Sequence, residues 1–289
     1  MFAGRRRFRH WTRIMTKLEK LSAYLKAQGP FAVAASGGVD SMTLAVVAHR
    51  VDPRTEVFHA VSPAVPDQAT ARVERYADQE GWNLQIVDAG EVEDPDYVAN
   101  PANRCYYCKT HLYDTLTGRT SLTVASGTNM DDLGDYRPGL TAAQEHNVVH
   151  PYVESDINKE ELRAIAGTLK LYDLQDLPAA PCLSSRVTTG IAINVDMLPV
   201  INKTEQALWQ SLQMYLPLKG VRCRVRPEEI SVQVETSAAI DPQSDYFDEA
   251  RNIVNRIFSA HGFSDYLKTV SIEPYQRGSA FLIDTLEVK

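Results

Sequence analysis

Apolar residues recur at helical spacing near the start of the chain and then form a short continuous run. A helix is predicted over residues 11–28, because apolar side chains return every three or four positions, at Ile14, Leu18, Leu21 and Leu25. This helix ends at Gly29-Pro30, a common stop signal. Residues 31–35 are all apolar, which is typical of a short buried strand.

Strand-like and helix-like segments then alternate through about residue 175. This alternation predicts a parallel sheet with helices on both faces, a doubly wound, Rossmann-like α/β fold. Ligands bind such sheets at the carboxyl ends of the strands. We predict strands over residues 56–61, 83–87, 121–125 and 146–153, and helices over residues 42–49, 70–80, 105–116 and 158–169.

The pattern changes after Gly190, where it predicts a smaller α+β domain. We place the two domains at residues 1–190 and 195–289. We expect the second domain to serve in oligomerisation or in covering the substrate. Its predicted helices span residues 197–214 and 245–261, and its predicted strands span residues 221–226, 230–234 and 266–273.

One strand of the second domain alternates apolar residues with arginines. Cys223 shares a face with two valines, so we expect it to point into the core. Arg222, Arg224 and Arg226 then line the other face. They form either a basic ridge that meets a substrate phosphate or a neighbouring subunit, or a solvated strand face.

The chain has 289 residues and a formal net charge of −7, which argues against a general nucleic-acid binder. No apolar run approaches the roughly 20 residues that a membrane helix needs, and no apolar stretch of signal-peptide type follows the N-terminus. We therefore expect a cytoplasmic protein without membrane contact, and a homo-oligomer. Four cysteines in a cytosolic chain are poor candidates for disulfides, which leaves metal binding, catalysis or burial.

A glycine-containing loop, Ser-Gly-Gly-Val-Asp-Ser, lies between a predicted strand and a predicted helix. Gly37 and Gly38 allow its backbone to approach a ligand closely. Backbone N–H groups at the start of a helix form an anion site, to which Ser36 and Ser41 add hydroxyl donors. Asp40 is a carboxylate beside this anion site, a position that suits Mg²⁺ bound to phosphates.

The loop resembles the PP-loop of the ATP pyrophosphatase superfamily, which grips the pyrophosphate of ATP. It lacks the Gly-Lys-Ser/Thr of a Walker loop. The resemblance implies that the chain adenylylates its substrate and releases pyrophosphate. It also implies that Ala34 and Ala35 lie near the nucleotide, and that residues 126–129, which include Gly127 and Thr128, approach the adenosine.

Two cysteines, Cys105 and Cys108, lie one helical turn apart, and a third, Cys182, follows far along the chain. In a doubly wound sheet both segments can meet above the strand ends. Three thiolates can ligate an iron–sulfur cluster with one open iron, or a zinc ion with one open position. The spacing alone favours two partly buried cysteines on a helix over a metal site.

Four segments occur in an order that resembles the LarE family of ATP-dependent sulfur transferases: residues 103–109, 127–132, 135–140 and 181–186. The resemblance runs from near residue 15 to near residue 280 and covers both predicted domains. It implies that the substrate is pyridinium-3,5-biscarboxylic acid mononucleotide. The implied product is a dithiocarboxylate precursor of the nickel-pincer nucleotide cofactor.

The implied chemistry is coherent with the residues. Adenylylation converts a carboxylate, which is a poor electrophile, into an acyl adenylate that a sulfur nucleophile attacks. In one branch of the family, the cysteine that matches Cys182 gives up its own sulfur. In the branch with three cysteines, the resemblance implies a [4Fe-4S] cluster on Cys105, Cys108 and Cys182, with an extra sulfide as the donor. All three cysteines are present, so we favour the cluster branch.

Several further residues are candidates for this site. Ser185 and Arg186 resemble the family's phosphate-binding pair, and an arginine suits a bidentate phosphate contact. Arg137 is a candidate clamp on substrate or ATP, Lys109 a candidate for neutralising charge on the phosphates, and Asp131 a candidate magnesium ligand. The alternative for Ser185 and Arg186 is a turn with a surface salt bridge, and the alternative for Lys109 and Asp131 is a solvated side chain.

Other classes of function stay open. PP-loop tRNA thiolases share a Cys-x-x-Cys and a distant cysteine, and a strongly basic face would support them. Amide-forming PP-loop ligases share the loop but lack the cysteine trio. A non-catalytic nucleotide-sensing module is a third class, against which an intact Asp40 argues. We expect ATP, Mg²⁺ and a [4Fe-4S] cluster as cofactors, and a small-molecule nucleotide as the substrate.

Overall fold

The computed structural model describes residues 2–134, 136–179, 181–227 and 229–276, with the backbone alone for residues 2–12. Two compact units divide the chain. The first comprises residues 1–62, 67–91 and 105–179, and the second comprises residues 63–66, 92–104 and 180–289. The second unit thus takes two short segments from the first half of the chain.

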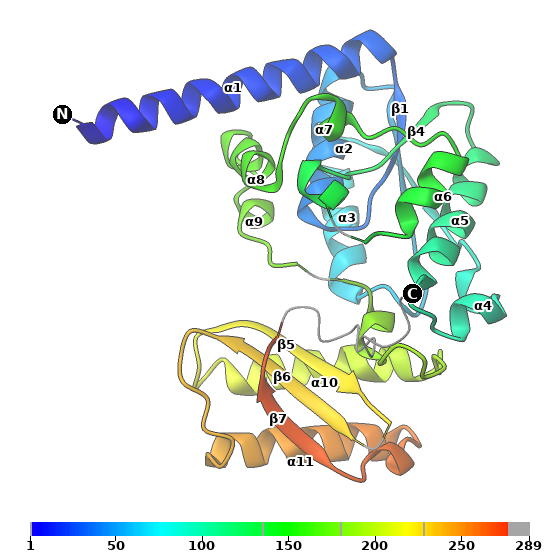
Figure 1. Cartoon of the computed structure of the whole chain (residues 1–289), viewed down its shortest axis with the longest axis vertical. Helices are drawn as coiled ribbons and strands as arrows, with labels where there is room; N and C mark the ends of the chain where they lie inside the picture. The colour runs from blue at the N-terminus through cyan, green and yellow to red at the C-terminus, as the bar shows by residue number, and fades with distance from the viewer. Residues whose placement is uncertain (1, 135, 180, 228, 277–289) are drawn as a thin grey trace. The chain divides into compact units, whose positions relative to one another are not determined.

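The first unit contains a four-stranded sheet whose strands are all parallel, in the order β3-β2-β1-β4 (Figure 1). Its strands are β1 (Phe31–Ala34), β2 (Glu56–Ala60), β3 (Asn83–Val87) and β4 (Thr123–Ala125). The predicted α/β architecture with a parallel sheet is confirmed. Because β1 pairs with both β2 and β4, the loop that follows it leaves the sheet near its middle.

The helical segments around this sheet are α1 (Phe2–Gln28), α2 (Val39–Val51), α3 (Asp67–Glu80), α5 (Arg104–Thr117), η2 (Met130–Gly134), α6 (Gly139–Glu145), α7 (Pro151–Glu154), α8 (Lys159–Thr168) and α9 (Tyr172–Gln175), while η1 (Glu91–Glu93) has one residue in this unit and two in the second. Helices cover both faces of the sheet (Figure 1). Phe31 and Val33 belong to a core shared with α1, α2 and α8, whereas Ala32 and Ala34 belong to a core shared with α5 and α6. Successive strand residues point to opposite faces, so a continuous apolar run serves both layers.

The fifth strand predicted over residues 146–153 does not form. Val149 makes a single parallel bridge to Ala125, and the helix α7 begins two residues later. Pro151 explains the difference, because proline cannot donate to a strand ladder but fits the first turn of a helix.

The second unit contains a three-stranded sheet in the order β5-β6-β7. The strands β5 (Leu218–Val225) and β6 (Ile230–Thr236) are antiparallel, and β7 (Val270–Pro274) runs parallel to β6. The helical segments are α4 (Pro95–Val98), η3 (Leu183–Arg186), α10 (Met197–Leu212), α11 (Asp245–Ala260) and η4 (Ser264–Tyr266). Both long helices have an apolar stripe that is buried in the core of this unit.

The arginine face of β5 is not solvated at two of its three positions. Cys223 is fully buried, as predicted, but Arg222 and Arg224 are also buried, with 6% and 5% exposure. Arg222 lies over the ring of Tyr275 and pairs with Glu235, while Arg224 hydrogen-bonds to polar groups. The solvated-face alternative is therefore wrong for these two arginines, because polar and aromatic partners cover this face of the sheet.

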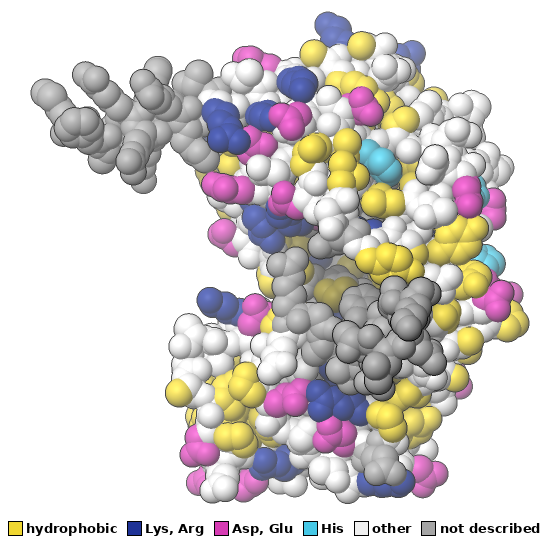
Figure 2. Space-filling model, in the orientation of Figure 1, with side chains coloured by type: hydrophobic (Ala, Val, Ile, Leu, Met, Phe, Trp, Pro, Cys, Tyr) yellow, Lys and Arg dark blue, Asp and Glu magenta, His cyan; other side chains and the backbone are white. Residues whose placement is uncertain are grey.

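No helix in the described part of the chain is long and apolar enough to cross a membrane. On the face drawn in Figure 2, acidic and basic side chains are interspersed in each unit and are not gathered by sign. This distribution agrees with the modest net charge of −7.

Candidate active site

The loop after β1 is shaped by two glycines, and it leads directly into α2. Gly37 has a φ of +78°, which few residues other than glycine adopt. A Cβ atom on Gly37 would lie 2.8 Å from the carbonyl oxygen of Ala69 in α3. Gly38 is the extended N-cap of α2. The loop therefore requires glycine for its conformation and for its close contact with α3.

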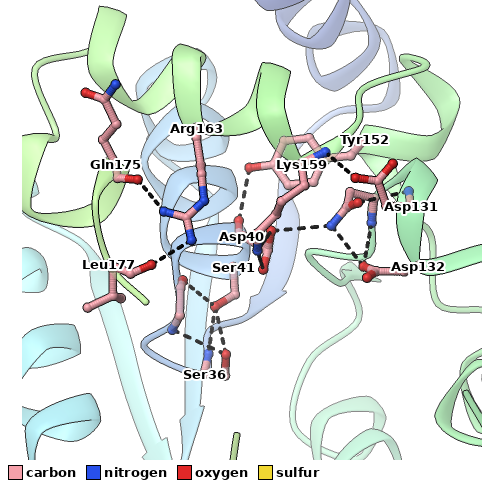
Figure 3. Close-up of polar contacts among 12 residues, drawn as sticks. Ser36, Asp40, Ser41, Asp131, Asp132, Tyr152, Lys159, Arg163, Gln175 and Leu177 are labelled. Carbon is pink, nitrogen blue, oxygen red and sulfur yellow. Dashed lines mark hydrogen bonds and ion pairs between the residues drawn. The ribbon is translucent and has the colours of Figure 1, made fainter. Parts of the chain in front are cut away.

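The two serines of the loop hold its ends together. The backbone N–H of Ser36 donates to Ser41 Oγ over 2.9 Å, and the two hydroxyl oxygens lie 3.1 Å apart (Figure 3). The Ser41 hydroxyl also donates to the carbonyl of Gly38 over 3.3 Å. The loop is thus closed around the start of α2, where free backbone N–H groups and the helix dipole favour an anion.

Asp40 lies in the first turn of α2 and is held by a lysine that the sequence analysis missed. Lys159 Nζ lies 2.6 and 2.5 Å from the two carboxylate oxygens of Asp40 (Figure 3). Both side chains are about one-third exposed. The ammonium group therefore stands at the position beside Asp40 where a metal cation is expected, within reach of a ligand on the loop.

Lys159 reaches this position because it is the first residue of α8. Asn158 caps that helix: its side chain accepts from the N–H of Glu161, and the Glu161 carboxylate accepts from the N–H of Asn158. The backbone N–H of Lys159 donates to Asp131 over 3.1 Å. A cation opposes the helix dipole in a first turn, and this mismatch is the sequence signal that marks Lys159 as a functional candidate.

Two further groups contact Asp40. Asn129 Nδ2 lies 3.4 Å from the Asp40 carboxylate and donates to Asp132 over 3.0 Å. The buried Tyr152 hydroxyl donates to the backbone carbonyl of Asp40 over 3.0 Å (Figure 3). Burial raises the pKa of Tyr152 well above its usual value, with the Asp40 charge adding to the effect, so it stays a neutral donor. The start of α2 is therefore fixed by contacts from distant segments.

The predicted adenosine segment lies against the loop. A Cβ atom on Gly127 would come within 2.7 Å of the Ser41 nitrogen. The hydroxyls of Ser126 and Thr128 lie 3.1 Å apart, and His150 Nδ1 is 2.9 Å from Ser126 Oγ. Burial lowers the pKa of His150, so this imidazole is neutral near pH 7. The structure thus brings Gly127 and Thr128 together with the loop.

Lys109 and Arg137 belong to a neighbouring part of the first unit. The Lys109 side chain packs against Gly139, where a Cβ atom would lie 2.9 Å from its Cγ, and its ammonium lies 5.6 Å from the ring centre of Tyr113. Arg137 is exposed and pairs with Asp132 over 2.7 Å. Asp131 is exposed and accepts from the start of α8. Asp135, the first residue of the predicted 135–140 segment, lies outside the described residues.

The three candidate cysteines are distributed over both units. Cys105, which is exposed, and Cys108, which is half-buried, lie on the first turn of α5 in the first unit. Cys182 is half-buried and belongs to the second unit. In the described ranges of the chain, no three His, Cys, Asp or Glu side chains are grouped so that they could hold a metal ion.

The loop that carries Cys182 is fastened by Arg186 and Ser185. Arg186 is 5% exposed and makes two contacts of 2.9 Å with the Glu205 carboxylate. Its remaining terminal nitrogen donates to the carbonyl of Pro181 over 2.8 Å. The Ser185 hydroxyl donates to the carbonyl of Cys182 over 2.7 Å. The predicted phosphate pair thus holds the cysteine loop in this structure.

A second set of contacts fastens the same loop from residues 92–104. Asn100 is fully buried with a φ of +57°, and its amide donates to the carbonyls of Thr188 and Ile191, both over 2.9 Å. Arg104 donates to the carbonyl of Ser184 over 3.2 Å. The segment that ends next to Cys105 therefore also orders the chain that follows Cys182.

Comparison with known proteins gives three relevant similarities. The chain is 34% identical to the uncharacterised protein slr1717 of Synechocystis over 269 residues, which is 91% of this chain and 96% of that protein. It is 27% identical to the uncharacterised protein MJ0830 of Methanocaldococcus jannaschii, over 67% of this chain and 76% of that protein. It is 29% identical to a protein of Lactiplantibacillus plantarum named pyridinium-3,5-bisthiocarboxylic acid mononucleotide synthase, over 68% of this chain and 72% of that protein. No protein-family model matches the chain.

Proposed function

Because this chain belongs to the same family as the Synechocystis protein, and its similarity to the Lactiplantibacillus synthase supports the LarE family, we propose that it is an ATP-dependent sulfur transferase. The proposed substrate is pyridinium-3,5-biscarboxylic acid mononucleotide. The product is a sulfur-bearing precursor of the nickel-pincer nucleotide cofactor. The fold of the first unit is then a PP-loop ATP pyrophosphatase fold.

The observation that carries the proposal is the loop at residues 36–41 with its Asp40–Lys159 pair. The loop offers N–H and hydroxyl donors to phosphates at the start of α2. A carboxylate oxygen of the substrate attacks the α-phosphorus of ATP, and the bond from that phosphorus to the bridging oxygen breaks. Pyrophosphate leaves with the electron pair, and an acyl adenylate remains.

Mg²⁺ fits this site by its donors, since Asp40 already binds a cation in the form of the Lys159 ammonium. Asp40 and Asp131 would hold the metal that enters with ATP. Asp131 is linked to this site because its carboxylate accepts from the backbone N–H of Lys159. Lys159 would then neutralise phosphate charge, a role that Lys109 and Arg137 share in this proposal. When bound, the magnesium ion supplies charge neutralisation on the leaving pyrophosphate.

The second half of the proposed reaction is attack of sulfur on the acyl carbon, with AMP as the leaving group. Cys105, Cys108 and Cys182 are thiols with some exposure, and thiolates are the usual ligands of iron–sulfur clusters. We propose that they hold a [4Fe-4S] cluster. When bound, such a cluster with an open iron supplies a position for an additional sulfide. Arg186 and Ser185 keep the backbone at Cys182 in place.

The adenylylation step is tested by exchange of labelled pyrophosphate into ATP, with the biscarboxylic mononucleotide as the acceptor. Asp40→Asn is expected to abolish the exchange, because it removes a charge that both Lys159 and the metal require. Asp156→Asn is the matched control, since Asp156 lies at the surface and pairs with Lys17. Exchange at the normal rate in Asp40→Asn would show that the loop is wrongly assigned.

The sulfur half is tested on protein purified without oxygen. The cluster proposal predicts a brown protein with absorbance near 400 nm and about four irons and four sulfides per chain. Cys105→Ser should lose this absorbance, whereas Cys223→Ser should keep it because Cys223 lies fully buried in the core of the second unit. A colourless protein that also fails reconstitution would refute the cluster. Mass spectrometry after turnover would then be expected to find Cys182 short of one H₂S.

A further inference from the structure

The first turn of helix α3 packs against the loop at residues 36–41. A Cβ atom on Gly37 would meet three atoms of Ala69 within 2.8–3.0 Å. The buried His59 adds a second link, since its two ring nitrogens lie 2.8 Å from the Ala35 carbonyl and 2.9 Å from the Thr70 hydroxyl. Side chains on the face of α3 that carries Ala69, including those one turn later, therefore lie next to any ligand that the loop binds.

One of these side chains is Arg72. Its terminal nitrogen donates to the carbonyl of Gly37 over 2.7 Å, and the side chain is half-buried. Among the described residues, this carbonyl is the only hydrogen-bond partner of Arg72, and no carboxylate pairs with it. A guanidinium carries five N–H donors, so four are left for other acceptors beside the loop.

The next arginine of the same helix has a different environment. Arg75 pairs with Asp173 over 2.7 Å and is about half exposed. Burial lowers the pKa of Arg72, and the charge of Arg75 adds to this effect. Arg72 thus keeps a positive charge in a partly desolvated place without a contacting carboxylate, which is costly unless an anion binds there.

The charges around the loop indicate which anion this is. The charges of Asp40 and Lys159 neutralise each other in their ion pair. A bound polyphosphate brings several negative charges, and the guanidinium of Arg72 is in hydrogen-bond contact with the loop that binds it. Arginine matches phosphate oxygens with two parallel N–H groups.

We propose that Arg72 binds the β- and γ-phosphates of ATP and holds the pyrophosphate as it leaves. This inference rests on the proposed ATP-dependent adenylylation. Arg72 keeps one N–H on the Gly37 carbonyl, and its other donors contact the phosphates. In the step itself, the bond between the α-phosphorus and the bridging oxygen breaks, and the electron pair passes to the pyrophosphate that Arg72 contacts.

The test measures binding of ATP, inorganic pyrophosphate and AMP to the full chain by calorimetry, in the presence of Mg²⁺. Arg72→Gln should weaken ATP and pyrophosphate binding about 10- to 100-fold, the range for losing a charged hydrogen bond, and leave AMP within about twofold. Arg72→Lys should recover part of the loss. Arg75→Gln, on the same helix, should bind all three ligands as the wild type does.

Each other outcome has a defined meaning. If Arg72→Gln binds pyrophosphate as tightly as the wild type, the assignment of Arg72 is overturned while the ATP site stands. If it loses AMP as strongly as ATP, Arg72 only shapes the loop, and the pyrophosphate assignment is overturned as well. A wild-type chain that binds neither ATP nor pyrophosphate would overturn the proposed function and this assignment with it.

Discussion

The contact between Gly127 and the start of α2 leads to a prediction that needs no ligand to be known. In Gly127→Ala, the new Cβ atom would lie 2.7 Å from the Ser41 nitrogen and 2.9 Å from the Asp40 carbonyl carbon. Both are backbone atoms, so no flexible side chain can move aside. Ordinary contact begins near 3.4 Å, and the segment after β4 must therefore shift by about 0.7 Å away from the loop.

The size of the effect follows from this shift. Inserting a methyl group into a tightly packed contact costs about 1–3 kcal/mol of unfolding free energy. A displacement approaching 1 Å between substrate-positioning segments lowers turnover by up to about 100-fold. We therefore expect Gly127→Ala to fold, to lose about 2 kcal/mol in urea denaturation, and to exchange pyrophosphate about 10- to 100-fold more slowly.

Gly134→Ala is the control, because a Cβ atom on Gly134 meets no atom of the described residues within 4 Å. It should match the wild type in both stability and exchange. If Gly127→Ala exchanges pyrophosphate as fast as Gly134→Ala, the segment after β4 is not part of the nucleotide site. If its stability is also unchanged, the close contact that the structure gives is itself refuted.

Three further predictions concern helix α8 and the second unit. Asn158→Ala removes the cap of α8 and should cost about 1 kcal/mol in urea denaturation, whereas Asn158→Ser should restore most of it; equal stability of all three would refute the cap. Burial acts to raise the pKa of Glu273, but hydrogen bonds from Gln233 and Arg226 outweigh this effect, so the pKa of Glu273 lies below its usual value. Glu273→Gln should therefore cost about 1 kcal/mol at pH 7, and the difference should shrink as the pH falls below about 4; a constant difference would contradict this reasoning. Asn100→Ala should lower the melting temperature more than Asn100→Gly, because only glycine keeps the positive φ at little cost; the reverse order would contradict the backbone geometry.

The loop at residues 36–41 could be recognised in the sequence because its chemistry is contiguous. One strand, two glycines and one helix start supply all the groups of the candidate anion site, so neighbouring residues are enough. The pairing of Asp40 with Lys159 could not be recognised in this way, since 119 positions separate the two residues. Only the parallel sheet and the capped start of α8 bring them together.

The errors have equally local causes. An apolar segment over residues 146–153 has a strand-like composition, but Pro151 favours the first turn of a helix. Period-two alternation in β5 left a solvated arginine face open as one of two alternatives. Arg222 and Arg224 are buried there because Tyr275, Glu235 and Gln233 cover them. Periodicity reports which residues share a face, but not what packs against it.

The way in which the Cys182 loop is held determines how far the fold depends on the sulfur atom of that cysteine. The carbonyl oxygen of Cys182 accepts hydrogen bonds from both the backbone N–H and the hydroxyl of Ser185. The Arg186 guanidinium donates to the carbonyl of Pro181. These anchors belong to the main chain and are independent of the sulfur atom. A change at the Cys182 sulfur, by oxidation or by substitution, should therefore leave the conformation of this loop intact.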